Sequence, residues 1–173
     1  GPIYTRVQSN GPLKLGKLFL FEGGIRVPMV VKMPGKFKPD TVYDHPTSTL
    51  DLFPTICALA GIKVPNDIHL DGVDLTPFVN GQTAGAPHET LFWSNGPNIA
   101  VRKGNWKLVK SCDNAWLFDL GNDIGESSNL ANTKPELVEQ LEKAYQKWRS
   151  QMSNPAWPSK PNRRKVEVDG LIY

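Results

Sequence analysis

The sequence predicts an α/β fold in two unequal parts, the first of which is the end of a larger α/β domain. Residues 27–33 form a short apolar run, typical of a strand buried on both faces of a sheet, and a capped apolar helix follows. After Gly81 the pattern changes to short strand candidates and one long amphipathic helix. We therefore expect residues 1–84 to complete an α/β domain and residues 85–173 to form an antiparallel sheet-plus-helix subdomain with an extended tail.

The first part contains too few elements to form a domain alone. The apolar run 27–33 ends at a Pro-Gly pair, as a short buried strand should. Polar residues at 47–51 supply N-caps for a helix that extends through Leu59 and that Gly61 ends. One strand and one helix cannot bury a core unaided, so most of this domain is expected outside the chain.

The second part is expected to be an antiparallel meander covered by a helix. A tight link at 103–105 joins the middle two of four strand candidates, which are residues 91–93, 98–102, 106–110 and 116–120. Thr133 and Glu136 form a capping-box pattern around Pro135 and predict the start of a long helix. The apolar residues of that helix recur at helical spacing and should cover one face of the sheet; they are Leu137, Leu141, Tyr145, Trp148 and Met152.

Charge and composition argue against two classes of partner. Twenty basic and 17 acidic residues leave a formal net charge of +3, too small and too scattered to predict nucleic-acid binding. The dense basic run 162–165 is interpreted as a solvated end rather than a phosphate-binding patch. No apolar stretch approaches the length that crosses a bilayer, so we expect no membrane partner. Cys57 lies in an apolar segment and is expected to be a small buried residue.

Neither the histidines nor the acidic loops predict a metal site. His45, His69 and His88 are spaced too irregularly for a ligand set, and each suits a loop residue with one hydrogen bond. The segment from Asp71 to Asp74 holds two carboxylates but lacks the other ligands of a calcium loop, so a turn explains it better. We therefore predict no metal ligand and no cofactor-binding residue in this chain.

A specific resemblance begins at residues 10–28, which read NGPLKLGKLFLFEGGIRVP. This segment resembles the stretch that type I, formylglycine-dependent sulfatases, the arylsulfatases among them, carry between their last metal ligands and a core strand. In that family a lysine five residues before Glu-Gly-Gly-X-Arg-X-Pro contacts the sulfate group, and Lys17 has that position. Further segments match in the same order over roughly residues 10–150, namely 48–55, 70–77, 100–109 and 117–130.

The resemblance implies an alkaline-phosphatase-like sulfatase fold and a sulfuric ester hydrolase that acts on aryl or carbohydrate sulfates. It implies that Lys17 is the catalytic residue of this chain, while Glu22 and Arg26 brace the loop and Gly23 and Gly24 permit its backbone path. The family's formylglycine and calcium ligands are expected upstream. The implied partners are thus a sulfate-ester substrate and the missing N-terminal portion, and the chain alone is predicted to be inactive. The family, with the lack of Asn-X-Ser/Thr acceptors, favours a periplasmic or secreted, bacterial protein.

The sequence departs from the family pattern near Lys17, and two other functions stay open. Leu15 and Leu18 stand where the family commonly has glycine, which predicts an altered backbone path there. One alternative is a related phosphate or phosphonate ester hydrolase, which the nucleophile motif would distinguish. The other is a non-catalytic binding module for sulfated glycans built on the sheet and helix. Such a module has no need of the segment around Lys17.

Overall fold

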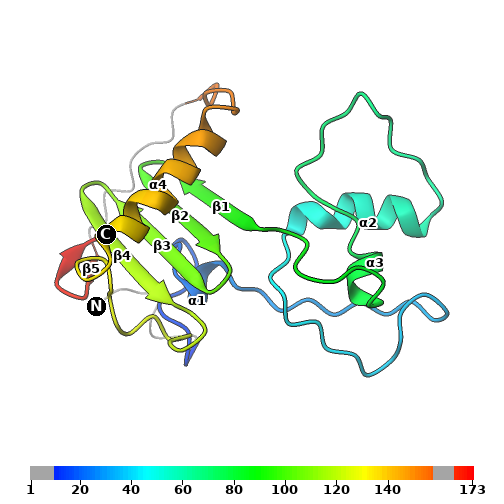
Figure 1. Cartoon of the computed structure of the whole chain (residues 1–173), viewed down its shortest axis with the longest axis horizontal. Helices are drawn as coiled ribbons and strands as arrows, with labels where there is room; N and C mark the ends of the chain where they lie inside the picture. Colours follow the sequence, from blue (N-terminus) through cyan, green and yellow to red (C-terminus); the bar gives the residue numbers. More distant parts are fainter. Residues whose placement is uncertain (1–9, 158–165) are drawn as a thin grey trace. The chain divides into compact units, whose positions relative to one another are not determined.

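The computed structural model describes residues 10–157 and 166–173 and divides the chain into two compact units (Figure 1). Unit 1 combines the N-terminal segment through Val27 with the chain from Thr90 onward, and unit 2 comprises Pro28–Glu89. Residues 10–27, which the sequence placed with the first part, therefore fold with the sheet. None of the helices formed by the described residues has the length and apolar character needed to span a membrane.

Unit 1 is built on a four-stranded antiparallel sheet in the order β1-β2-β3-β4. Its strands are β1 (Thr90–Asn95), β2 (Asn98–Lys103), β3 (Trp106–Ser111) and β4 (Asn114–Asp119). Gly104, at a φ of 57°, lies in the tight turn between β2 and β3, where a left-handed residue matches the twist of the two strands. The predicted meander is confirmed, and each strand is slightly longer than its apolar centre indicated.

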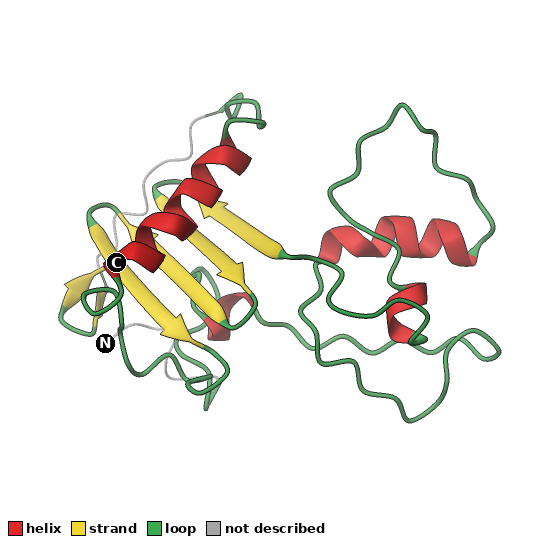
Figure 2. Cartoon of the chain, in the orientation of Figure 1, coloured by secondary structure: helices red, strands yellow, loops and turns green. Residues whose placement is uncertain are grey.

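Helix α4 (Pro135–Arg149) crosses one face of this sheet (Figure 2). Leu141 and Tyr145 are buried, and Leu137, Val138 and Trp148 pack beside them against Ile99, Val101, Leu108 and Leu117. The predicted apolar stripe is thus confirmed up to Trp148, whereas Met152 lies beyond the end of the helix.

The predicted capping box of α4 is wrong. The N-cap residue is Lys134, which makes no side-chain capping bond, and Pro135 is the first helical residue. The Thr133 hydroxyl instead donates to the Leu130 carbonyl at 3.0 Å, closing the preceding turn. A proline at the first helical position removes one unpaired donor and fixes φ, so the helix can begin without the box.

The opposite face of the sheet is covered by the N-terminal segment and by the C-terminal hairpin β5 (Glu167–Val168) and β6 (Leu171–Ile172). Phe21 and Val168 pack there against a core that includes Val109, Trp116 and Phe118. The Trp116 indole N–H donates to the Val168 carbonyl at 3.3 Å. The expected extended tail is therefore wrong for residues 166–173, because their apolar side chains complete this core. The basic run at 162–165 lies outside the described residues.

Unit 2 contains a short 3-10 turn, η2 (Thr49–Asp51), helix α2 (Leu52–Leu59) and helix α3 (Thr76–Val79). The predicted helix is confirmed: Ser48 and Asp51 form a capping box at its start, and Gly61 follows its end at a φ of 69°. Cys57 is buried, as its apolar neighbours indicated.

The strand expected at residues 27–33 is not formed. The described structure assigns no strand there, and the Val30 side chain is 94% exposed. An apolar run becomes a strand only beside another strand that accepts and donates backbone hydrogen bonds. None of the described residues supplies such a neighbour to this segment.

Candidate functional site

Residues 14–23, here called the lysine loop, present Lys17 on the surface of unit 1. The Gly23 N–H donates to the Lys14 carbonyl at 2.9 Å and closes the loop, and the Phe19 N–H donates to the Gly16 carbonyl at 3.1 Å within it. Lys17 lies within the loop, between Gly16 and Phe19, with its side chain exposed. The loop thus holds one ammonium group in solvent on a hydrogen-bonded backbone, an arrangement suited to contacting an anion.

Gly23 and Gly24 allow the two sides of this loop to approach each other closely. A Cβ atom on Gly23 would lie 2.4 Å from the Leu15 carbonyl oxygen, and one on Gly24 would lie 2.0 Å from the Phe19 carbonyl oxygen. Both distances are far below a van der Waals contact, and the clashing atoms belong to the backbone. The prediction that these glycines permit a path closed to other residues is confirmed.

The backbone on both sides of Lys17 is left-handed. Leu15 has a φ of 58° and Leu18 a φ of 84°, in a region that L-residues with a Cβ rarely occupy. The family that this segment resembles is expected to have glycine at these positions. The leucines therefore adopt conformations that glycine would adopt without strain.

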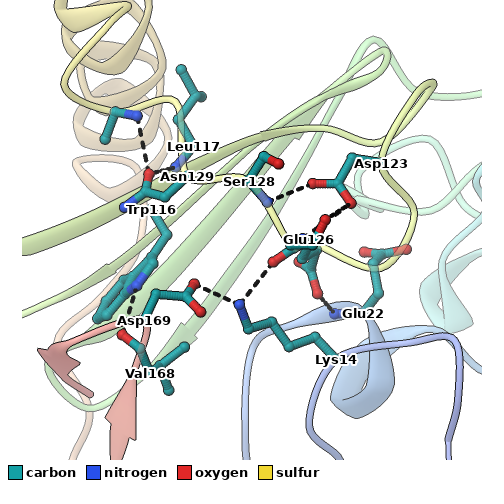
Figure 3. A network of polar contacts seen from close by, with 12 residues as sticks. Lys14, Glu22, Trp116, Leu117, Asp123, Glu126, Ser128, Asn129, Val168 and Asp169 are labelled. Carbon is teal, nitrogen blue, oxygen red and sulfur yellow. Dashed lines mark hydrogen bonds and ion pairs between the residues drawn. The ribbon is translucent and has the colours of Figure 1, made fainter.

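A buried charge cluster anchors the end of the lysine loop to the sheet. The Lys107 ammonium, on β3, lies 2.8 Å from Glu22 Oε1 and 2.8 Å from Glu126 Oε1. All three residues are at most 1% exposed. Glu126 Oε2 also accepts a 2.7 Å hydrogen bond from the Glu22 backbone N–H (Figure 3). Glu22 is thus a structural residue, as expected, and its partners come from distant parts of the chain.

Two further cations lie beside the Glu22 carboxylate of the cluster. Arg102 and Arg26 approach Glu22 Oε2 at 3.5 and 3.6 Å. Burial raises the pKa of the Glu126 carboxyl above its ordinary value, and the attraction of Lys107 only partly opposes that rise. Burying two carboxylates is tolerable here because cations and a backbone donor lie against them.

Lys14 fixes the beginning of the same loop. Its ammonium donates to the Glu126 carbonyl at 2.8 Å and pairs with the Asp169 carboxylate at 2.5 Å (Figure 3). Nearby, the Leu20 N–H donates to the Tyr173 hydroxyl at 3.1 Å, and burial raises the pKa of that hydroxyl.

The sequence reasoning missed Lys14, Lys107 and Asp169. The one signal for Lys107 was its place in the apolar pattern of β3, two residues before the buried Val109.

Other polar groups singled out from the sequence have structural roles. His88 Nε2 lies 2.8 Å from Oδ1 of the buried Asp51, while His69 is exposed and His45 lies against Tyr43. The Asp74 carboxylate accepts from the Thr76 N–H at 2.9 Å, which makes the 71–74 segment a turn. Among the described residues no three His, Cys, Asp or Glu side chains are grouped so as to hold a metal ion.

The nucleophile motif of the family that this chain resembles is Cys/Ser-X-Pro-X-Arg, whose first residue becomes the formylglycine. This sequence contains one literal match, Ser-X-Pro-X-Arg at residues 159–163. This match lies outside the described residues and after the last helix. In the family that the lysine loop resembles, the nucleophile motif precedes that loop. The match at 159–163 is therefore in the wrong order to be assigned as the nucleophile.

Comparison with known proteins agrees with this fold. The family described as N-sulphoglucosamine sulphohydrolase, C-terminal, matches residues 14–151. Steryl-sulfatase of Mus musculus is 35% identical in an alignment 155 positions long, which covers 70% of this chain and 25% of that protein. Arylsulfatase A of Bos taurus is 34% identical in an alignment 157 positions long, which covers 75% of this chain and 31% of that protein. The crystal structure of Ps i-CgsB in complex with k-i-k-neocarrahexaose is similar with a TM-score of 0.77 and 32% identity, over 91% of this chain and 36% of that chain.

These matches define a class, the sulfatases, and the part of them to which the chain corresponds. The chain belongs to the sulfatase family and corresponds to its C-terminal region, with the expected four-stranded antiparallel sheet and helix. It spans 25% and 31% of the length of the two curated relatives.

Proposed function

We propose that this chain supplies Lys17 as a sulfate-contacting catalytic residue to a larger sulfatase that hydrolyses aryl or carbohydrate sulfate esters. The observation that carries the proposal is the exposed Lys17 ammonium on a loop whose two ends are both tied to buried groups. Membership of the sulfatase family supports the reaction class. The names of similar proteins, which include steryl and aryl sulfatases and a structure with a bound neocarrahexaose, support the substrate classes.

The chemistry required of Lys17 follows from the charge on a sulfate ester. Negative charge increases on the sulfate and bridging oxygens as the ester bond breaks. A fixed ammonium beside them stabilises the transition state more than the ground state. Lysine suits this role because it is a compact charge whose three donors can turn among several oxygens.

The rest of the proposed active site comes from the polypeptide that precedes this chain in the full-length protein. Because this chain spans only 25% and 31% of two curated relatives, we assign the family's calcium and formylglycine to that preceding part. Unit 2 has apolar side chains for such a partner to cover, with Val30 94%, Ile56 60% and Phe53 58% exposed. By itself, this chain should not turn over sulfate esters. Export to the periplasm or secretion from a bacterium is part of the same proposal.

The test is Lys17→Ala in the full-length polypeptide, assayed on an aryl sulfate and on a sulfated oligosaccharide. Loss of one such donor typically costs about 3 kcal/mol in the barrier, so kcat should fall roughly a hundredfold. Lys147→Ala is the matched control, since Lys147 is an exposed lysine on α4 of the same unit. Near-normal turnover by Lys17→Ala would refute the assignment.

The same assays separate the proposal from its alternatives. Faster turnover of an aryl phosphate or phosphonate than of the aryl sulfate would favour the related ester hydrolase. Binding of the sulfated oligosaccharide without turnover of any ester by the full-length polypeptide would favour the non-catalytic module.

A further inference from the structure

Both ends of the lysine loop converge on Glu126, more than a hundred residues away in sequence (Figure 3). At the start of the loop, the Lys14 ammonium donates to the Glu126 backbone carbonyl at 2.8 Å. At its end, the Glu22 N–H donates to Glu126 Oε2 at 2.7 Å. Glu126 thus fixes the distance between the two ends of the loop that carries Lys17.

The surroundings of Glu126 leave this anchor little freedom. Glu126 is fully buried, and its other carboxylate oxygen lies 2.8 Å from Lys107, itself held by Glu22. Its φ is 54°, a conformation that persists in a non-glycine residue only where neighbouring contacts fix it. Buried charges of this kind require close partners in a defined geometry, so a shift of the loop would leave a charge unpaired.

We propose that Glu126 is a positioning residue for Lys17, acting through the Lys14 and Glu22 ends of the lysine loop. The inference rests on the proposed function of Lys17 and adds the group that places it. Glu126 does not contact substrate, because it is fully buried beneath the loop. Its role is to hold the Lys17 ammonium where the sulfate oxygens will be, and small displacements of such a group are costly in rate.

A double-mutant cycle in the full-length polypeptide tests this role. Glu126→Gln keeps the size of the side chain and an oxygen acceptor but removes the charge that faces Lys107. We expect it to lower kcat roughly ten- to a hundredfold with a smaller change in KM. In the Lys17→Ala background the same substitution should change kcat by less than about twofold, because residues that act through one group are not additive.

The matched control is Glu142→Gln. Glu142 lies on α4, and its carboxylate pairs at 2.6 Å with Lys110, which lies on β3 as Lys107 does. This pair is away from the lysine loop. Glu142→Gln should leave kcat unchanged both in the otherwise unchanged polypeptide and in the Lys17→Ala variant. Equal effects of Glu126→Gln with and without Lys17 would overturn the inference and leave Lys17 catalytic. A lack of effect of Lys17→Ala itself would instead refute the proposed function.

A second variant covers the case in which Glu126→Gln does not fold. Lys14→Met removes the contact to the Glu126 carbonyl, the pair with Asp169 and the cation–π contacts with Phe21 and Phe118, but leaves the Glu126 carboxylate in place. If Glu126 positions Lys17, Lys14→Met should also lower kcat and also lose its effect when Lys17 is alanine. An additive result with Lys14→Met would overturn the inference in the same way.

Discussion

Leu15 and Leu18 flank Lys17 in left-handed conformations, at φ values of 58° and 84°. Such a conformation costs an L-residue roughly 1–2 kcal/mol, because its Cβ crowds the following carbonyl. The close approaches of Gly23 and Gly24 and the anchored ends of the loop leave the backbone no relaxed path. Backbone strain of this kind clusters at functional sites, so it supports the proposed role of Lys17.

Leu18→Gly should therefore stabilise the full-length polypeptide. Relief of the left-handed strain should outweigh both the greater freedom of glycine in the unfolded chain and the loss of a side chain that is already 49% exposed. We expect the free energy of unfolding, measured in urea, to rise by about 0.5 kcal/mol or more. Leu13→Gly is the control in the same segment; Leu13 does not have a positive φ, so this change should lower stability. A loss of stability in both variants would contradict the strain argument.

At the scale of elements, unit 2 is organised around one buried carboxylate. Asp51 is fully buried at the start of α2 and accepts from the Ser48 N–H at 2.7 Å and the Val73 N–H at 2.9 Å. His88 approaches the same carboxylate at 2.8 Å. Gly72 lets the segment that contains Val73 pass close to the start of α2, since a Cβ atom on Gly72 would lie 2.1 Å from the Leu50 carbonyl oxygen. The helix cap and two distant loops thus share one anchor.

Asp51→Ala should loosen unit 2. The substitution leaves two backbone donors without their acceptor and removes the capping box, at an expected cost of about 3 kcal/mol. The measurement is limited proteolysis of the full-length polypeptide, with the sites of cleavage identified by mass spectrometry. New cleavage should concentrate within residues 28–89. Asp67→Ala, at an exposed position of the same unit, should leave the cleavage pattern unchanged. An unaltered pattern for Asp51→Ala would show that the carboxylate is not the anchor.

Most elements with local signals were predictable from the sequence, except the strand expected at residues 27–33, and their long-range contacts were not. The β1–β4 meander, α2 and α4 follow from apolar periodicity, turn glycines and caps, which neighbouring residues determine. The position of Lys17 was predicted from a motif. The contacts that hold it join Glu22 to Lys107 and Glu126 over 85 and 104 residues, and no local pattern encodes such pairs. The capping box at Thr133 failed because α4 begins one residue later than predicted, with Lys134 as its N-cap, and the Thr133 hydroxyl donates to the Leu130 carbonyl instead.

At the scale of the whole molecule, the two units differ in how completely they bury their apolar side chains. The sheet of unit 1 is covered on both faces, by α4 and by the lysine loop with the C-terminal hairpin. Unit 2 leaves Phe53 and Ile56 of α2 more than half exposed, with Val30 almost fully so. The chain spans 25% of one curated relative and 31% of another. An apolar surface of this kind suits a segment of the same polypeptide better than solvent.

The substitution Phe53→Ser should therefore raise the solubility of the chain expressed alone but lower the stability of the full-length polypeptide. In the chain expressed alone it removes exposed apolar area, so the soluble fraction after centrifugation should increase. In the full-length polypeptide the same residue is expected to be buried, so the free energy of unfolding should fall by roughly 3 kcal/mol. Trp157→Ser, an exposed apolar residue outside unit 2, controls for the general effect on solubility and should not destabilise the full-length polypeptide. Equal stability of the full-length polypeptide with and without Phe53 would mean that this face of α2 stays in solvent, and that the preceding residues pack elsewhere.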